Sequence, residues 1–320
     1  MHLWQFSFIA ALFAPAWLLP AFAKDGESVP MVSHEPISAT VLVAKRDGKK
    51  RKRRGSGDNA VDAQSPCTAC ESLEGFVPPN EVTADVKIMV GKQRGIDKSE
   101  AVAIQKARGA LETGLVAAFI DGATCPEIDS EQWAIDYSHK RPFAALHKGV
   151  DIPQPRGTPI RAIAAGMVVG RFLNDGDRKG IEVMIRHTPG QTGLPYWTYS
   201  QYTHLQVMPP VAIGDSVEMG QEIGKTSNTG KMGRRVRRDA LHFAIVYSTQ
   251  ASWTNDGLFV APKDGYWMDP NAFYRRNPPY DSQSLAALPD DQERVAVPYM
   301  QPDGNFVPAD TRRIWPYPCT

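Results

Sequence analysis

Short runs of apolar and alternating residues recur between residues 143 and 274, with glycine and proline between them. The clearest runs are Pro159–Ala164, Met167–Phe172, Ile181–His187, Tyr196–Leu205 and Leu241–Tyr247. Side chains alternate between the two faces of a strand, and short runs separated by turn residues are typical of all-β barrels and sandwiches. No strand–helix–strand spacing accompanies these runs. The pattern therefore predicts a mainly β domain, with an antiparallel sheet, over residues 141–276.

Helical signals occur only before this domain. Asp97 followed by Glu100 has the spacing of a capping box and predicts a helix from about Lys98 to Thr113. Gly109 and Gly114 weaken the far end of that helix. We therefore expect a small helix-containing segment over residues 81–140. Residues 277–320 are rich in proline and predict an extended C-terminal wrap or linker.

The first 23 residues contain no Asp, Glu, Lys or Arg, and they close with Ala21-Phe22-Ala23 ahead of Lys24. An apolar run followed by a small-x-small site is the pattern of a cleavable secretory signal. The alternative is an uncleaved membrane anchor, because the run is nearly long enough to span a bilayer. Pro15 and Pro20 would disturb such a helix. Both alternatives predict export to the periplasm or cell envelope.

Residues 24–80 show no sustained helical or strand period and include the basic run from Lys45 to Arg54. A block of like charges repels itself and is typical of a disordered, solvated linker. The whole chain has a formal net charge of +1, so charge gives no overall bias toward nucleic acid or membrane. Export argues against a nucleic-acid partner. The run is either a plain linker or a contact for anionic envelope polymer or lipid.

All four cysteines lie beyond the signal-like segment: Cys67, Cys70, Cys125 and Cys319. An even number in an oxidising compartment favours disulfides. No second C-x-x-C motif and no strand–helix context accompanies Cys67 and Cys70, so a local disulfide or a pair of free thiols is favoured over a redox or metal site. A bond between Cys125 and Cys319 is compatible with the sequence, which does not decide it.

Three histidines and an aspartate offer candidate metal ligands. His147 precedes Asp151 by four residues, with Gly149 between them; His204 and His242 lie in later predicted strands. Imidazole nitrogen and carboxylate oxygen are zinc ligands, and three protein ligands with one open position is the catalytic arrangement. Taken alone, H-x-x-x-D is a weak signal that ordinary polar residues also produce. Three further histidines, His34, His139 and His187, have no candidate partners nearby in the sequence.

The sequence motifs around these residues resemble those of the M23 metallopeptidases of the LytM and lysostaphin type. The matching motifs occur in the same order as in the family, across residues 143–274. They are His147-x-Gly-x-Asp151, Gly157-Thr158-Pro159-Ile160, Ala165-Gly166-x-Val168, Tyr202-x-His204-Leu205, Gly214-Asp215-x-Val217-x-x-Gly220-Gln221-x-Ile223-Gly224, Ser227-Asn228-Thr229-Gly230, Leu241-His242-Phe243 and Asp269-Pro270.

This resemblance implies a specific site and reaction. His147, Asp151 and His242 would bind Zn²⁺, and His204 would assist catalysis by contacting the activated water or the developing oxyanion. The reaction implied is hydrolysis of a peptide bond in bacterial peptidoglycan, by a water that the zinc activates.

Two features depart from the family pattern. The family's H-x-H motif has two imidazoles on one face of a strand, whereas Ala240 occupies the first position here. The loop before it is longer and basic, and Arg234 and Arg235 are candidate substrate contacts together with Tyr202; a plain solvated loop is the alternative. Asp239 is a candidate replacement for the missing base, although strand alternation would turn it away from the metal.

Three hypotheses follow for the function. The first is a zinc endopeptidase of the cell wall, impaired or narrowed by Ala240. The second is a non-catalytic LytM-type module that activates or positions a cell-wall amidase. The third is an envelope protein in which zinc only stabilises the fold. The intact ligand trio favours the enzyme, and Ala240 favours the regulator.

Overall fold

The computed structural model describes residues 67–91, 95–141, 143–174, 179–230 and 238–320. The signal-like segment, the basic run from Lys45 to Arg54, and Arg234 and Arg235 lie outside these residues, so the expectations made for them stay predictions. Within the described ranges, no helix is long and apolar enough to cross a bilayer.

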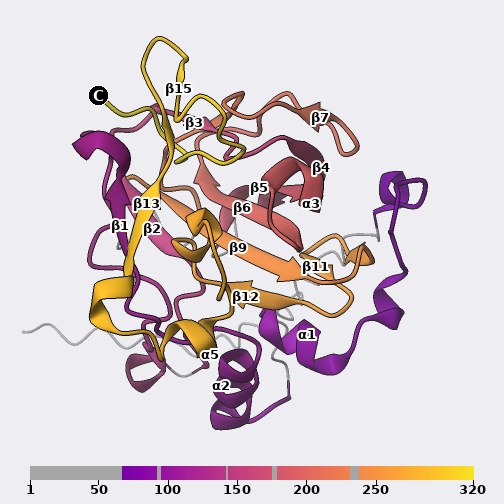
Figure 1. Ribbon diagram of the computed structural model, residues 1–320. Helices are drawn as coiled ribbons and strands as arrows, with labels where there is room; N and C mark the ends of the chain where they lie inside the picture. Colours follow the sequence, from indigo (N-terminus) through magenta and orange to yellow (C-terminus); the bar gives the residue numbers. More distant parts are fainter. Residues whose placement is uncertain (1–66, 92–94, 142, 175–178, 231–237) are drawn as a thin grey trace, which may run out of the picture. The chain divides into compact units, whose positions relative to one another are not determined.

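An antiparallel sheet of seven strands forms the centre of the structure (Figure 1). Its strands follow the order β12-β9-β6-β5-β4-β7, and β2 pairs with β9 beside this path. Their bounds are β2 Val150–Pro153, β4 Gly166–Asn174, β5 Gly180–His187, β6 Trp197–Leu205, β7 Ser216–Val217, β9 Ala240–Ser248 and β12 Tyr266–Met268. The path ends at β12 and β7 and does not close, so the sheet is not a barrel. The prediction of a mainly β, antiparallel domain is confirmed.

The three longest pairings of the sheet join β4 to β5, β5 to β6 and β6 to β9. The predicted runs Ile181–His187, Tyr196–Leu205 and Leu241–Tyr247 coincide with β5, β6 and β9 to within a residue or two. Every residue of β5 is buried, as are all of β6 except its first. Because both faces are covered, these strands are nearly continuous apolar runs interrupted by a few polar residues, and those polar residues carry the chemistry described below.

Four small strand pairs surround the sheet. They use β1 Val116–Phe119 with β13 Arg294–Val297, β3 Pro159–Arg161 with β8 Glu222–Lys225, β10 Trp253–Asn255 with β11 Val260–Pro262, and β14 Tyr299–Met300 with β15 Phe306–Val307. Only the β1–β13 pair is parallel among the described strands. It joins the segment before the sheet to the segment after it, which a parallel pair permits because its strands are far apart in sequence.

The described helices are short: α1 Ala84–Met89, α2 Lys98–Ala107, α3 Pro189–Thr192 and α5 Ser282–Leu285. The predicted start of α2 is confirmed, because the Asp97 carboxylate accepts hydrogen bonds from the N–H groups of Ser99 and Glu100. The predicted end at Thr113 was wrong. Gly109 has φ +93°, and a Cβ there would lie 2.4 Å from the carbonyl oxygen of Trp267, so the chain leaves the helix to pass close to β12.

The C-terminal segment packs onto the sheet instead of extending away from it. Trp315 and Tyr317 are buried, and the Trp315 N–H donates to the carbonyl of Pro298. The hydroxyls of Tyr317 and Thr226 lie 2.6 Å apart, and the Arg161 N–H donates to the carbonyl of Pro316. The proline-rich tail is therefore a wrap, whose aromatic side chains join the same hydrophobic core as the sheet.

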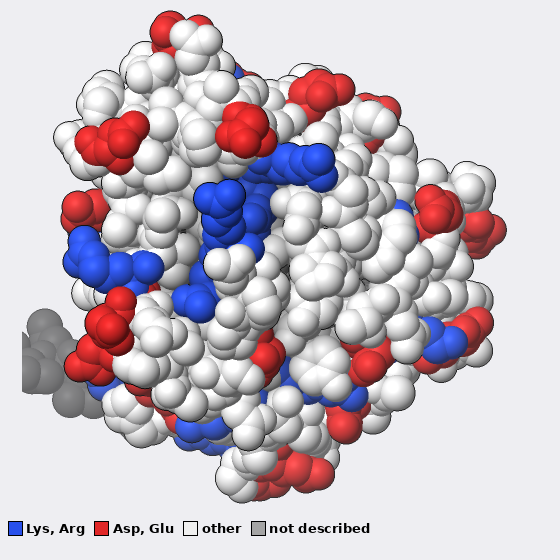
Figure 2. Space-filling view, viewed as in Figure 1, with Lys and Arg blue, Asp and Glu red and all other residues white. Residues whose placement is uncertain are grey.

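Charged side chains are unevenly distributed over the face drawn in Figure 2. Lys and Arg gather in a hollow near the middle of the view, and Asp and Glu are scattered around it. The formal net charge of +1 therefore hides a local separation of charge on this face.

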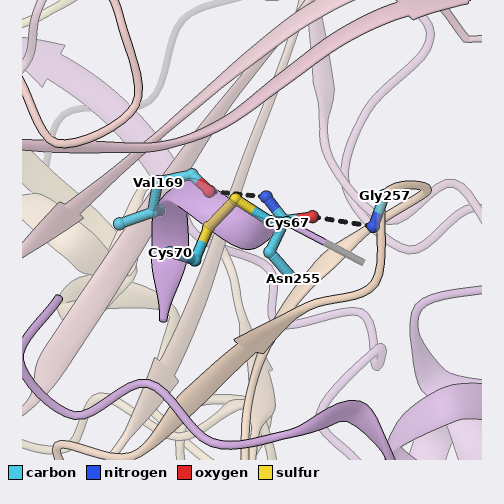
Figure 3. Close-up of a disulfide and its surroundings, with 5 residues drawn as sticks. All are labelled: Cys67, Cys70, Val169, Asn255 and Gly257. Carbon is cyan, nitrogen blue, oxygen red and sulfur yellow. Dashed lines mark hydrogen bonds between the residues drawn. A yellow bond between two sulfur atoms is a disulfide. The ribbon is translucent and has the colours of Figure 1, made fainter. Parts of the chain in front are cut away.

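Both disulfides lie in structural positions. Cys67 bonds Cys70 at the start of the described chain (Figure 3), and Cys125 bonds Cys319, so no described cysteine is free. Beside the first bond, the Asn255 side chain donates to the carbonyl of Val169 and accepts from the N–H of Gly257. The C-x-x-C motif is therefore a local disulfide packed beside β10, and the open pairing of Cys125 with Cys319 is resolved in favour of the bond.

We expect the two disulfides to differ in their effect on stability. Cys125 and Cys319 are 194 residues apart, whereas Cys67 and Cys70 are only three apart. Loop-closure entropy predicts losses of about 5 kcal/mol and about 2 kcal/mol in unfolding free energy when each pair is replaced by serine. Urea unfolding of the two double-serine variants measures this. A larger loss from the Cys67/Cys70 variant would contradict the entropic account.

Candidate metal centre

Three potential metal ligands converge where β2 lies beside β9. Asp151 on β2 is directly opposite His242 on β9, and His147 lies in the loop that leads into β2. The Asp151 Oδ1 atom is 2.9 Å from His242 Nδ1 and 3.3 Å from His147 Nε2, and the two nitrogens are 3.1 Å apart. In the described part of the chain, this is the one group of three or more His, Cys, Asp or Glu side chains with metal-ligand geometry.

The hydrogen bond at the far side of His147 decides what its inner nitrogen can do. Nδ1 lies 2.8 Å from the carbonyl oxygen of Gln132, which can only accept, so Nδ1 carries the proton. In the neutral ring Nε2 then carries a lone pair, and it faces the carboxylate of Asp151. Both His147 Nε2 and Asp151 Oδ1 are therefore acceptors, and a single proton on His242 Nδ1 could form a good hydrogen bond to only one of them. A cation at the centre would satisfy all three atoms.

The distances also fit a tetrahedral metal ion. Ligand atoms about 2.0–2.1 Å from zinc are separated by about 3.3 Å along the edge of a tetrahedron. The three measured separations of 2.9–3.3 Å are slightly shorter than this value. A ligating histidine that donates its other N–H to a backbone carbonyl, as His147 does, is the usual outer-shell arrangement.

Electrostatics favour an ionised Asp151. Burial alone would raise the pKa of this carboxyl, but hydrogen bonds from the imidazoles of His147 and His242 in their protonated forms, together with the charges of those forms, hold the pKa well below its usual range. Asp151 is 3% exposed and therefore offers a desolvated negative charge to the centre.

Gly149 allows the motif to close on itself. A Cβ at this position would lie 2.6 Å from Cε1 and 2.7 Å from Nε2 of His242. Any larger residue between His147 and Asp151 would push the His242 ring out of place. The glycine of H-x-G-x-D is therefore explained by the close approach of an imidazole from the neighbouring strand.

The segment before the domain supports the ligands along the outer side of β2. The Asp151 N–H donates to the carbonyl of Glu131, and the N–H groups of Ala134 and His147 donate to the carbonyls of His147 and Ile135, respectively. Sequence reasoning assigned no role to this segment, because its contribution is made by backbone atoms that leave no side-chain signal.

A β-bulge turns His204 toward the candidate metal ligands. Ile181 lies opposite Leu205 and Glu182 opposite Thr203, so the register of the β5–β6 pairing shifts by one residue at His204. Its φ is +67°, an uncommon value for a residue other than glycine. Thr203 pairs with His242 across β6 and β9, so these two side chains share one face of the sheet. Strict alternation would place His204 on the other face. With the bulge, the ring centroids of His204 and His242 are 6.1 Å apart.

Thr229 stabilises this bulge from the loop before β9. Its carbonyl accepts a hydrogen bond of 2.8 Å from His204 Nδ1, and its hydroxyl accepts from the Ile181 N–H and donates to the Leu205 carbonyl. Gly180 permits the contact, since a Cβ there would lie 2.4 Å from the Thr229 backbone. The proton on His204 is thereby fixed on Nδ1, and Nε2 carries the lone pair in the neutral ring. Thr229 belongs to the motif Ser227-Asn228-Thr229-Gly230, but the sequence did not indicate that it stabilises the bulge.

A buried carboxylate extends the polar row across the sheet. Glu182 is fully buried and accepts hydrogen bonds from Gln201 and Thr203, while Lys179 lies 3.6 Å away. Thr203 is opposite both Glu182 and His242. The strand pattern gave no reason to single out Glu182, because an acidic residue inside a buried strand looks the same as one on an exposed face.

The departures from the family pattern have clear positions. Ala240 begins β9, is 5% exposed, and shares a strand face with His242, so a methyl group stands where an imidazole was expected. Asp239 does not approach the ligands, since its carboxylate pairs with Arg156 at 3.4 Å. Arg238, the first described residue after the basic loop, pairs with Asp129.

Tyr202 is not a substrate contact in this structure. Its side chain is fully buried, its hydroxyl accepts a hydrogen bond of 3.0 Å from the Ile163 N–H, and its ring lies 5.7 Å from that of Phe243. Odd and even positions of β6 face opposite sides, so Tyr202 points into the core when Thr203 points toward the centre. The prediction for Tyr202 was wrong for this reason.

Comparison with known proteins assigns the domain. Residues 145–253 match the sequence profile of peptidase family M23. This stretch contains His147, Asp151, His204 and His242. These residues belong to peptidase family M23. The match places the candidate ligands His147, Asp151 and His242 inside an M23 domain, and the flanking segments outside it.

Individual relatives extend the comparison. The uncharacterized lipoprotein YgeR of Escherichia coli (strain K12) is 29% identical over 202 residues, which cover 60% of this chain and 72% of YgeR. The DD-carboxypeptidase/endopeptidase Mpg of Neisseria gonorrhoeae is 35% identical over 86 residues, covering 27% of this chain but only 17% of Mpg. The lysostaphin catalytic domain of Staphylococcus simulans is 29% identical, with 35% of this chain and 75% of that one covered and a TM-score of 0.27.

We expect the M23 domain to bind one divalent metal ion through its three candidate ligands. His147→Ala and His242→Ala should each reduce metal content from one equivalent to near zero, because two ligands hold a metal far less tightly than three. Metal analysis of the dialysed protein measures this. His139→Ala is the matched control, since His139 is exposed and is not one of the three converging candidate ligands. Full metal content in His242→Ala would remove His242 from the site.

Proposed function

We propose that this M23 domain is a zinc-dependent endopeptidase that hydrolyses peptide bonds of bacterial peptidoglycan. The observation that carries the proposal is the convergence of His147, Asp151 and His242 within 2.9–3.3 Å of one another, with His204 turned toward them. The relative Mpg, whose name records carboxypeptidase and endopeptidase activity, supports the reaction class. The substrate is an inference from the family.

The three ligands suit zinc better than a hard cation. Two imidazole nitrogens and one carboxylate oxygen match zinc, whereas calcium and magnesium prefer sites made entirely of oxygen. With these three described residues as its protein ligands, the ion would keep a position for water or substrate. When bound, zinc would polarise the scissile carbonyl and lower the pKa of a water molecule to about 7.

His204 is the residue proposed to move or hold a proton. Its Nδ1–H is fixed by the carbonyl of Thr229, so Nε2 is the nitrogen that can accept a proton or, once protonated, donate a hydrogen bond to a developing oxyanion. The bulge and Thr229 hold the ring in one orientation. His147 and Asp151 are held by the backbone of residues 131–135, which keeps the whole site preorganised.

Ala240 supports a second candidate function. The M23 pattern has an imidazole at this position, beside the last ligand. Asp239, the described candidate to replace it, is paired with Arg156 instead. The second candidate is a metal-binding module that acts on a wall amidase instead of cutting the wall itself. Export to the periplasm or envelope, and contact of Lys45–Arg54 with anionic polymer or lipid, are compatible with both functions.

Release of peptides from purified peptidoglycan separates these candidates. We expect the wild-type protein to create new amino and carboxyl ends in stem peptides or cross-bridges, detected by mass analysis of muropeptides. His204→Ala should lower the rate by about 10²–10⁴-fold while leaving the metal content unchanged, because His204 contributes to the reaction and not to binding the ion. Metal-loaded wild-type protein without any release, but with stimulation of a purified wall amidase, would favour the regulator.

The contribution of the missing imidazole is testable by restoring it. Ala240→His should raise the rate of muropeptide release by about 10²-fold or more, because a second acid or base would stand beside His242. Ala240→Gln is the control for side-chain size, and it should give no comparable increase. Equal rates in the wild type and in Ala240→His would show that the absent imidazole does not limit turnover.

A further inference from the structure

Two pairs of consecutive arginines meet in the folded chain although they are far apart in sequence. Arg275 and Arg276 come after β12, and Arg312 and Arg313 belong to the C-terminal segment. The Arg313 guanidinium donates to the carbonyls of Phe273 and Arg275, which brings the two pairs together. Figure 2 shows Lys and Arg gathered in a hollow on the face that carries β13, the strand between these two segments in the chain.

This arginine cluster lacks acidic partners. The described arginines that form ion pairs are Arg108, Arg156 and Arg238. Within the described ranges, no ion pair joins an Asp or Glu to any of the four guanidinium groups of the cluster. Positive charges that are not compensated locally attract an anion from outside and repel a cation.

Donor atoms of the cluster are open to solvent. Arg276 and Arg312 are exposed. Arg312 donates through Nη1 to the carbonyl of Gly190, and the Arg276 side chain forms no hydrogen bond with a described residue. A guanidinium with free N–H groups along one edge can bind a carboxylate through two parallel hydrogen bonds. The cluster can therefore bind an acidic group without giving up its present contacts.

A series of tyrosine rings adjoins these arginines. The ring centroid of Tyr196 lies 6.0 Å from that of Tyr280 and 4.8 Å from that of Tyr247. The Tyr247 ring is 5.9 Å from that of Tyr266, and the Tyr280 hydroxyl donates to the carbonyl of Arg276. Tyr196 and Tyr266 are partly exposed. A tyrosine offers a flat apolar ring and a polar tip, so an exposed one suits a ligand that has both kinds of surface.

A donor and an acceptor flank Tyr196. A Cβ on Gly193, three residues before Tyr196, would lie 3.8 Å from Cδ of Arg312, so the arginine passes beside this turn. On the other side is Asp281, which caps α5 through one carboxylate oxygen. Burial, and after it the negative charge of Asp281, raises the pKa of both Tyr196 and Tyr247, so this carboxylate lies close to their hydroxyls.

This arrangement distinguishes between kinds of anion. A chain of closely spaced phosphates would be attracted by the arginines but repelled by Asp281. An acidic saccharide matches every part of the surface. The C–H face of a sugar ring can lie on Tyr196, its hydroxyl and amide groups can donate to Asp281, and its carboxylate can accept from Arg276 and Arg312.

We propose that the surface formed by Arg276, Arg312, Tyr196 and Asp281 binds a saccharide chain whose sugar rings carry carboxylates. The choice of peptidoglycan strands as the source of this saccharide rests on the proposed function. The surface is separate from the candidate metal centre, because Tyr247 lies five residues along β9 from the candidate ligand on that strand and therefore on the opposite face of the sheet. It would hold the domain on the glycan while leaving the metal centre free.

Calorimetric titration of the whole chain with peptidoglycan strands freed of their peptides tests this. We expect binding that becomes at least tenfold weaker when the carboxylates of the strands are converted to methylamides, because a neutral amide cannot replace the charge. Binding should be unchanged in His147→Ala. Because these strands carry no stem peptide, their binding is measured independently of the proposed hydrolysis, and either result can occur without the other.

A set of variants tests the charge and the ring separately. Arg276→Gln with Arg312→Gln should weaken binding by about threefold to tenfold, as expected for two exposed ion pairs. Lys140→Gln with Lys225→Gln is the matched control, since it removes the same charge at two exposed positions outside the surface and should leave binding unchanged. Tyr196→Ala should weaken binding at least threefold, whereas Tyr196→Phe should retain it because the ring remains.

Four results would overturn the proposal. The first is equal affinity for the native and the methylamide strands, and the second is unchanged binding in Arg276→Gln with Arg312→Gln or in Tyr196→Ala. The third is tighter binding of inorganic polyphosphate than of the strands, which would assign the arginines to phosphate. The fourth is loss of binding in His147→Ala, which would place the strands at the metal centre.

Discussion

The register between β2 and β9 is the constraint on which the candidate site depends. In this register Asp151 lies directly opposite His242, and both side chains therefore project from the same face. A slip of one residue would turn one of the two toward the core. Backbone hydrogen bonds from residues 131–135 hold the other side of β2, and Gly149 leaves the space that the His242 ring occupies. The ligand geometry is therefore a consequence of strand pairing on both sides of one short strand.

The second half of the site departs from regular strand geometry. His204 reaches the site face because a bulge interrupts the alternation of β6, and Thr229 supplies the hydrogen bonds that the bulge removes from the ladder. Backbone conformations of this kind persist only where the surroundings fix them, and they are concentrated at functional sites. The candidate metal ligands are thus placed by strict strand register, whereas His204 is placed by a local break of register.

Segments outside the M23 domain contribute to both sides of β2. Residues 127–135 orient His147 on one side, and on the other side they line a cavity of about 440 Å³. Residues 269–271 and Trp315 complete that cavity, and the Cys125–Cys319 disulfide ties the segment before the sheet to the C-terminal wrap. The candidate metal centre and this cavity therefore lie on the two sides of β2.

The sequence alone determined the mainly β class, because strands show a period of two. It determined the start of α2, because the capping residue Asp97 lies beside the residues that it caps. It also determined the identity of the candidate ligands, because these occur in short motifs. It also placed β5, β6 and β9 closely, since long buried strands carry strong apolar signals. Tertiary structure decided the rest. Contacts between residues that are not neighbours in sequence decide four features. These are the core position of Tyr202, the pairing of Asp239 with Arg156, the end of α2 at Ala107, and the orientation of His147 by the Gln132 carbonyl. Such contacts are made by backbone atoms and by close approach in space, and neither leaves a pattern in the order of the amino acids.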